Sequence, residues 1–209
     1  MIIIIVSLPK VVVFDAFGTL IKIGGRRSPY LKLMKWLRSN GRTPSNQDAR
    51  IIMSHNFDFK KWGEFFGEKL PVELLEAMNM DLALELKSIQ IYPDVISTLQ
   101  YLKKNGFKIA LCSNLAMPYG EHLKQIVVDY FDAVIFSYEV GVIKPQKRIY
   151  EVIEEKINYP MSQMLFIGDN QILDVDMPIS LGMSARLIDR KKGQSLSDIL
   201  DDLINIEKV

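Results

Sequence analysis

The sequence predicts an α/β protein with one open, parallel β-sheet between layers of helices and an all-helical insertion after the first strand. Two observations predict this class. From about residue 91 onward, helical segments alternate with short apolar runs, the order that produces parallel strands joined by right-handed crossovers. Residues 21–90 instead show helical patterns and no strand pattern, and a stretch of ~70 residues is far longer than an ordinary loop.

Five short runs are rich in the β-branched and aromatic residues that strands prefer. Most of them are apolar at consecutive positions, which is typical of parallel strands covered by helices on both faces. The predicted strands are residues 10–15, 107–112, 133–137, 164–168 and 185–188.

The helix predicted over residues 93–104 has clear signals at both ends. Pro93 stands in its first turn, and its last turn carries Lys103 and Lys104 before a stop at Gly106, as helix termini favour. Further helices are predicted over residues 119–129, 146–157, 172–181 and 195–206.

The insertion is predicted to contain helices over residues 29–39, 46–56, 57–67 and 72–88. It leaves the sheet at the carboxyl end of the first strand, where open α/β sheets bind their ligands. We therefore interpret it as a lid over a ligand site; the alternative is a helical elaboration that only adds stability.

Composition narrows the class of protein. Of the 209 residues, 48% are hydrophobic and 24% are charged, as in ordinary globular proteins. The net charge of +1 argues against a nucleic-acid partner. The single cysteine, Cys112, fits a reducing compartment, and we expect it to be a small buried hydrophobic residue.

The apolar start, Met1–Leu8, is too short to span a bilayer and lacks a basic leader. We expect a cytoplasmic protein without a membrane partner, and no oligomeric state is predicted. The segment Ile2–Val6 is interpreted as an extra strand, an interface piece or a frayed end.

Polar residues follow the first predicted strand. Asp15 ends this strand, Gly18 allows a tight turn, and Thr19 offers a hydroxyl. A carboxylate at the carboxyl end of a buried strand can act as a nucleophile or metal ligand, although alone it is more often a turn residue.

Two more strands are followed by polar groups. Ser113 and Asn114 come at the end of the second strand and can donate hydrogen bonds to an anion, or they form a turn. Lys144 precedes Pro145 at the start of a predicted helix, where cations are disfavoured. That position suggests a function, with a solvated lysine as the alternative.

The fourth strand is followed by Asp169, Asp174 and Asp176. Carboxylates around such a turn suit Mg²⁺, while Asp176 is interpreted as a partner of the helix dipole. Because the carboxyl ends of parallel strands meet at one edge of a sheet, we expect all these groups to share one crevice.

The order of these motifs resembles that of a known superfamily. Residues 15–20 (Asp-Ala-Phe-Gly-Thr-Leu), then Ser113-Asn114, then Lys144-Pro145, then Gly168-Asp169 with Asp174, resemble the four motifs of the haloacid dehalogenase-like hydrolases. The resemblance implies a Rossmann-like three-layer core, residues 1–20 plus 91–209. It also implies that residues 21–90 are that family's first-position helical cap domain.

The resemblance also implies how the anionic group is held. Asp15 would attack the substrate and form a covalent aspartyl intermediate. Ser113 and Lys144 would bind the anionic group, and Thr19 and Asn114 would orient it.

A Mg²⁺ cofactor is implied as well. Asp15, Asp169 and the backbone carbonyl of Phe17 would bind the ion, with Asp174 supporting the metal site. Mg²⁺ and a lysine together let an anionic carboxylate approach a phosphate dianion.

Phe17 departs from the pattern of the family's phosphatases, which usually carry a second aspartate at this position. General acid–base catalysis by such a group contributes about 10²–10⁴-fold. The first motif, and the spacing of six from Lys144 to Tyr150, instead resemble the metal-independent L-2-haloacid dehalogenases, whose halide leaves without a proton. Arg42 and Arg50 lie in the region where that branch has a halide-binding arginine.

The fourth motif favours a metal, since Asp169 facing Asp15 without a cation would raise one of their pKa values. We therefore expect a Mg²⁺-dependent hydrolase of a small phosphorylated metabolite, slow or in need of a good leaving group. The alternatives are a metal-independent L-2-haloacid dehalogenase and a catalytically weak binding protein. A phosphonate hydrolase, which also lacks the second aspartate, would need a Schiff-base lysine.

The start of the insertion is basic. Seven cationic residues and no acidic one occur in this stretch, which we interpret as a solvated helix face or as a surface that steers anions. They are Lys22, Arg26, Arg27, Lys32, Lys35, Arg38 and Arg42.

Overall fold

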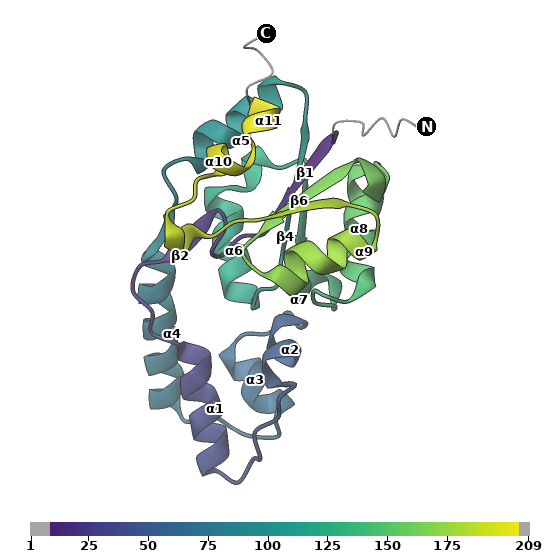
Figure 1. Ribbon diagram of the computed structural model, residues 1–209. Helices are drawn as coiled ribbons and strands as arrows, with labels where there is room; N and C mark the ends of the chain where they lie inside the picture. Colours follow the sequence, from purple (N-terminus) through teal and green to yellow (C-terminus); the bar gives the residue numbers. More distant parts are fainter. Residues whose placement is uncertain (1–8, 205–209) are drawn as a thin grey trace.

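The computed structural model of the chain describes residues 9–204, so the apolar segment 2–6 lies outside the described residues. Its main sheet has five strands in the order β5-β4-β1-β6-β7, all parallel (Figure 1). The predicted parallel sheet is confirmed. The strands are β1 (Val11–Phe14), β4 (Lys108–Ser113), β5 (Ala133–Phe136), β6 (Met164–Gly168) and β7 (Ser184–Leu187).

Helices cover both faces of this sheet. Successive side chains of a strand point to opposite faces, so Val12 and Phe14 join the cluster on one face while Val11 and Val13 join the other. The first face packs against α5 (Val95–Lys104), α6 (Met117–Ile126), α10 (Leu196–Ile199) and α11 (Asp201–Ile204). The second packs against α8 (Lys147–Ile157) and α9 (Met177–Ser180), and α7 (Ser137–Val140) follows β5 directly.

Two predicted helices are divided in the structure. The segment predicted over residues 119–129 forms α6 and a separate 3₁₀ turn, Val128–Tyr130. The segment predicted over residues 172–181 forms a π-helical turn, Gln171–Asp176, followed by α9. Pro178, in the first turn of α9, has no N–H to donate, so it cannot continue a regular α-helical ladder.

The prediction that residues 21–90 contain no strand is wrong. β2 (Ile21–Ile23) pairs antiparallel with β3 (Ile89–Ile91), with Ile21 opposite Ile91. Strands of three residues carry too little alternation to be recognised in a sequence. The chain therefore enters and leaves the insertion through one short two-stranded ribbon.

The insertion has an apolar cluster of its own. Its helices are α1 (Pro29–Ser39), α2 (Asp48–Met53), α3 (Phe59–Phe65) and α4 (Val72–Lys87), and they lie below the carboxyl ends of the sheet strands in Figure 1. Leu33, Leu37, Trp62 and Met78 are fully buried among them. This cluster supports our proposal that residues 21–90 form a domain distinct from 1–20 plus 91–209.

Among the helices within residues 9–204, none is both long and apolar enough to cross a membrane. Cys112 is buried in β4 as expected, and burial raises the pKa of its thiol to about 12.

Candidate active site

The loop after β1 forms a tight turn that brings Asp15 to the edge of the sheet. The Asp15 N–H donates to the Ile167 carbonyl at 2.9 Å, which extends the β1–β6 pairing by one residue. Gly18 has φ +79°, and a Cβ at this position would lie 2.0 Å from Oδ2 of Asp169. Only glycine fits here, because any side chain would meet both a left-handed backbone and a neighbouring carboxylate.

Asp15 is held by two donors from other strands and loops. Ser113 Oγ donates to Asp15 Oδ1 at 2.9 Å, and Lys144 Nζ donates to the same oxygen at 2.8 Å. The Asp15 side chain is only 11% exposed. Within residues 9–204, Oδ2 of Asp15 accepts no hydrogen bond. One carboxylate oxygen is thus fixed and the other is free.

Lys144 is a buried cation between two carboxylates. Its Nζ also contacts Asp174 Oδ1 at 2.6 Å, and its side chain is 2% exposed. Burial alone would lower the pKa of this ammonium, but the attraction of Asp15 and Asp174 outweighs burial and raises it. Lys144 is therefore charged, and it supplies the cation that the buried carboxylates of Asp15 and Asp174 need.

Asp174 accepts hydrogen bonds from two neighbouring residues, Lys144 and Asn170. Its Oδ1 accepts from Lys144, and its Oδ2 accepts from the Asn170 N–H at 3.0 Å. Burial, with the negative charge of Asp15, raises the pKa of its carboxyl despite the opposing effect of Lys144. A Cβ on Gly168 would lie 2.2 Å from Asp174 Oδ2, so a glycine is needed to let the carboxylate approach β6.

Asp169 completes a cluster of three carboxylates. Ligand oxygens of Asp15, Asp169 and Asp174 lie within 4.8 Å of one another. Burial and the proximity of Asp15 raise the pKa of Asp169. Among the described residues, no hydrogen bond reaches the Phe17 carbonyl oxygen. Hard oxygen donors in this arrangement fit a Mg²⁺ ion.

Two of the predicted substrate-binding residues, Asn114 and Thr19, differ in their surroundings. The Asn114 amide donates to the Lys144 carbonyl at 3.0 Å and accepts from the Lys144 N–H at 2.8 Å, so it fixes the loop that carries Lys144. Thr19 is fully buried, and its Oγ1 has no hydrogen-bond partner among the described residues.

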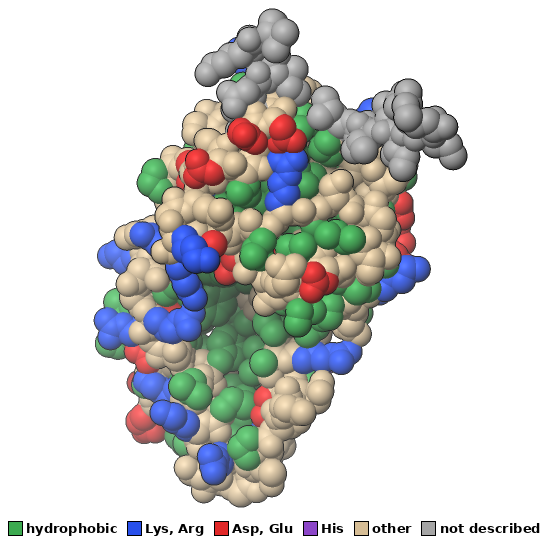
Figure 2. All heavy atoms as spheres, in the orientation of Figure 1, with side chains coloured by type: hydrophobic (Ala, Val, Ile, Leu, Met, Phe, Trp, Pro, Cys, Tyr) green, Lys and Arg blue, Asp and Glu red, His purple; other side chains and the backbone are tan. Residues whose placement is uncertain are grey.

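A cavity of about 940 Å³ lies between the core and the insertion. Phe17, Gly18, Asn114 and Asp169 line its core side. Figure 2 shows a hollow on one face of the molecule with hydrophobic side chains inside it and Lys and Arg side chains along one side. Of the basic run, Lys22 and Arg26 line this cavity, whereas Lys32 pairs with Asp81.

The arginines considered for halide binding differ in their surroundings. Arg42 makes a two-pronged contact with Asp48, at 2.8 Å through Nη1 and 2.5 Å through Nη2, and its guanidinium lies over the Phe66 ring. Arg50 is exposed. Tyr150 is buried and donates to the Leu173 carbonyl at 2.5 Å.

Glu85 is not among the residues predicted from the sequence, yet it lines the cavity and is 3% exposed. It accepts a hydrogen bond from the Tyr119 hydroxyl at 2.7 Å. The sequence does contain a signal for this residue, because Glu85 follows Met78 and Leu82 at the spacing of one helix face, and this face is buried. A carboxylate on such a stripe requires buried partners.

The family model described as haloacid dehalogenase-like hydrolase matches residues 9–182.

Similar sequences include phosphatases and dehalogenases. A glyceraldehyde 3-phosphate phosphatase of Methanopyrus kandleri is 33% identical over 113 residues, 53% of this chain and 48% of that protein. A phosphatase of Mycobacterium tuberculosis is 31% identical over 192 residues, 78% of this chain and 87% of that protein. An (S)-2-haloacid dehalogenase of Pseudomonas fluorescens is 28% identical, covering 69% of this chain and 66% of that protein. The chain thus spans about half the length of the Methanopyrus relative.

Similar structures share the fold. A HAD family enzyme of Bacteroides thetaiotaomicron has a TM-score of 0.69 at 18% identity, covering 93% of this chain and 99% of its own. Its complex with magnesium and inorganic phosphate gives 0.67 at 19% identity, with 91% and 98% covered. The L-2-haloacid dehalogenase of Xanthobacter autotrophicus gives 0.59 at 24% identity, with 95% and 84% covered.

Proposed function

The chain belongs to the haloacid dehalogenase-like hydrolases, and from this premise we propose that it is a Mg²⁺-dependent phosphatase of a small phosphorylated metabolite. One observation carries the proposal: Asp15, Asp169 and Asp174 bring ligand oxygens within 4.8 Å of one another. Two of these carboxylates have pKa values raised by burial and by Asp15. A divalent cation relieves such repulsion.

Asp15 is the proposed nucleophile. Its Oδ1 is fixed by Ser113 and Lys144, so its Oδ2 attacks phosphorus. A bond forms between this oxygen and phosphorus while the phosphorus–oxygen bond to the leaving group breaks, and the electron pair departs with that oxygen. Water then attacks the aspartyl phosphate, which releases inorganic phosphate and returns the carboxylate, and the water proton passes to solvent.

The remaining charged groups position the reaction. Asp15, Asp169 and the Phe17 carbonyl would hold Mg²⁺, and Asp174 would support the site by holding Lys144 and Asn170. When bound, the ion neutralises negative charge on the phosphoryl group. Lys144 and Ser113 are the proposed donors to the phosphoryl oxygens of a bound substrate. Thr19 is fully buried, so we propose that it helps to orient the substrate only indirectly, by supporting the loop after β1.

The relatives support a phosphorylated substrate. Two of them are named as glyceraldehyde 3-phosphate phosphatases and one as a phosphoglycolate phosphatase. Phe17 stands where the phosphatases of this family usually have a second aspartate. We therefore propose that the reaction is slow unless the leaving group departs without a proton.

A metal-independent haloacid dehalogenase is the second candidate. Phe17 and the similarity to (S)-2-haloacid dehalogenases favour it. Against it, the charge of Arg42 is neutralised by Asp48, and Asp169 stands close to Asp15. The same fold in a catalytically weak binding protein would show neither activity.

Hydrolysis of p-nitrophenyl phosphate tests the proposal. We expect Mg²⁺-dependent release of nitrophenol that EDTA abolishes, and its loss in Asp15→Asn and Asp169→Asn. Asp176→Asn is the matched control, because Asp176 is exposed and bonded to Gln171. Metal-free release of halide from 2-chloropropionate, with no phosphate release, would establish the dehalogenase instead.

A further inference from the structure

Part of the cavity wall that the insertion provides is apolar. Leu31 and Met34 of α1 and Ala49, Ile52 and Met53 of α2 line it. Leu31 is 54% exposed. The cavity volume of about 940 Å³ lies within the range of small-molecule sites, ~300–1,000 Å³.

Aromatic rings connect this wall to the catalytic edge. Phe17 contacts Tyr119 edge to face, with 5.9 Å between ring centroids. Tyr119 lies 6.4 Å from Tyr30 by the same measure. All three line the cavity beside Gly18 and Asp169. A ring placed here would meet aromatic edges and faces at favourable geometry.

Among the described residues, no carboxyl group that lines this cavity is free to protonate a leaving group. Its acidic side chains are Asp48, Glu85 and Asp169. Asp48 is bound by Arg42, Glu85 accepts from Tyr119 and from two backbone N–H groups, and Asp169 is the proposed metal ligand. A leaving oxygen of low pKa, which departs readily without protonation by such a carboxyl group, is therefore favoured.

An aryloxide satisfies both requirements, because it is apolar and leaves readily without a proton. We propose that this cavity takes the aromatic part of an aryl phosphate, with the ring between Phe17, Tyr30 and the α1 side chains Leu31 and Met34. The proposal rests on the proposed phosphatase function. It names a substrate class unlike the small polar phosphates of the relatives' names.

Binding of two non-hydrolysable probes tests the proposal without turnover. Phenylphosphonic and methylphosphonic acids would be titrated calorimetrically into the full chain with Mg²⁺. Burial of a Phe-sized group is worth ~1.5–3 kcal/mol, so we expect the phenyl compound to bind about 10- to 100-fold more tightly. Equal affinities, or tighter binding of the methyl compound, would overturn the proposal.

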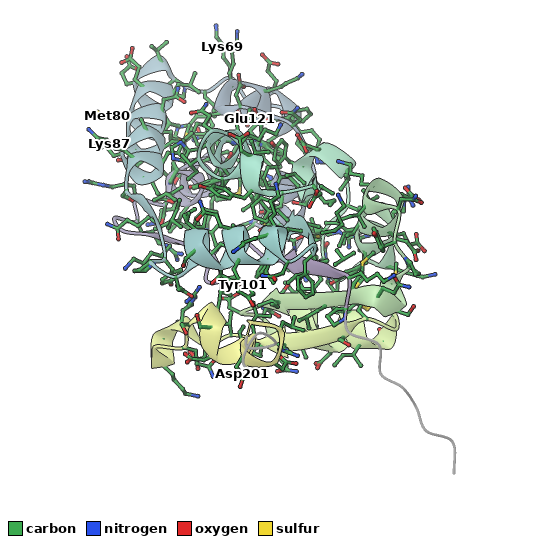
Figure 3. The ribbon with its side chains drawn as sticks, turned by 90° about the horizontal axis from the view of Figure 1, so that it is seen from above. Lys69, Met80, Lys87, Tyr101, Glu121 and Asp201 are labelled. Atoms are coloured by element: carbon green, nitrogen blue, oxygen red, sulfur yellow. The ribbon has the colours of Figure 1, made fainter. Side chains whose placement is uncertain are left out.

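Matched variants place the ring in the cavity. Leu31→Ser and Met34→Ser should each reduce the phenyl preference by ~3-fold or more, since part of the buried contact is lost. Leu84→Ser and Met80→Ser are the controls, because these α4 residues are 42% and 64% exposed and are absent from the cavity lining. Figure 3 shows Met80 and Lys87 pointing away from α4. If all four variants keep the preference for the phenyl compound, this cavity is excluded as the binding site of the ring.

The same preparations separate this inference from the proposed function. If nitrophenyl phosphate is hydrolysed but phenyl preference is absent, the phosphatase proposal stands and the aryl proposal fails. If phenyl preference is present without hydrolysis, the aromatic cavity stands and the phosphatase proposal fails.

Discussion

The hydroxyl of Tyr119 donates a 2.7 Å hydrogen bond to Oε1 of Glu85, which joins α6 of the core to α4 of the insertion. The other carboxylate oxygen of Glu85 accepts from the backbone N–H groups of Arg27 and Ser28. One buried carboxylate thus connects the segment that enters the insertion, the helix that leaves it, and the core. Burial, followed by the hydrogen bond to Glu85, raises the pKa of the Tyr119 hydroxyl, so it remains a donor.

Glu85→Gln should lower the free energy of unfolding by ~1–3 kcal/mol, because buried N–H groups lose a charged acceptor. Tyr119→Phe should cost less, ~0.5–1.5 kcal/mol, since only one hydrogen bond is lost. Urea unfolding measures both. Glu76→Gln, at an exposed position of α4, is the control, and an effect of Glu85→Gln no larger than that of Glu76→Gln would refute the role.

Lys144→Met should destabilise the core strongly. The substitution leaves Asp15 and Asp174 as buried carboxylates without their cation, and breaking a buried ion pair costs ~3–5 kcal/mol. Lys147→Met is the control, because Lys147 is 64% exposed and its ion pair among the described residues is with Glu151. The free energies of unfolding of the two variants, measured by chemical denaturation, should differ by most of that amount. Similar stabilities would contradict the charge balance described above.

Gly18→Ala should abolish hydrolysis and Mg²⁺ binding, because its Cβ would displace the Asp169 carboxylate, 2.0 Å away. Gly106→Ala separates this clash from backbone strain. Gly106 has φ +80°, almost the same as Gly18, and a Cβ there meets nothing within 4 Å. Both variants should lose ~1–2 kcal/mol of stability from the left-handed backbone, but only Gly18→Ala should lose activity. Retained metal binding in Gly18→Ala would argue against Asp169 as a ligand.

The Arg42–Asp48 pair predicts a pH dependence. The hydrogen bond from Arg42 lowers the pKa of the Asp48 carboxyl, against the opposing effect of burial. The unfolded value is ~3.9, so the pair stabilises the folded state above about pH 4, and its contribution is lost as pH falls through the lower folded value. The difference in unfolding free energy between the wild type and Asp48→Asn should therefore be constant near neutrality and shrink in acid. A difference that is flat down to about pH 2 would rule out this linkage.

Phe17→Asp tests the interpretation of the first motif. A carboxyl group at this cavity-lining position would supply the missing proton donor, worth at most about 10²–10⁴-fold. Hydrolysis of ethyl phosphate, whose leaving group needs a proton, should rise relative to that of p-nitrophenyl phosphate. Phe17→Asn is the control, since it changes polarity without adding an acid, and an equal gain in both variants would contradict the interpretation.

Features that depend on local sequence patterns could be predicted from the sequence alone. Buried runs such as Val11–Phe14 predict parallel strands because both faces are apolar, and Asp15 and Asp169 follow their strands at the shared edge. Features that depend on contacts between distant segments were not predictable in this way. The hydrogen bonds between the Asn114 amide and the backbone of Lys144, 30 positions away, are an example.

The short β2–β3 ribbon places the two ends of the insertion side by side, with Ile23 opposite Ile89. A segment whose ends already meet can be replaced by a tight hairpin turn, or by an unrelated module, without altering the register of the catalytic strands. An exchange of the insertion at this ribbon would therefore change one side of the cavity and leave the strands that precede Asp15 and Asp169 as they are.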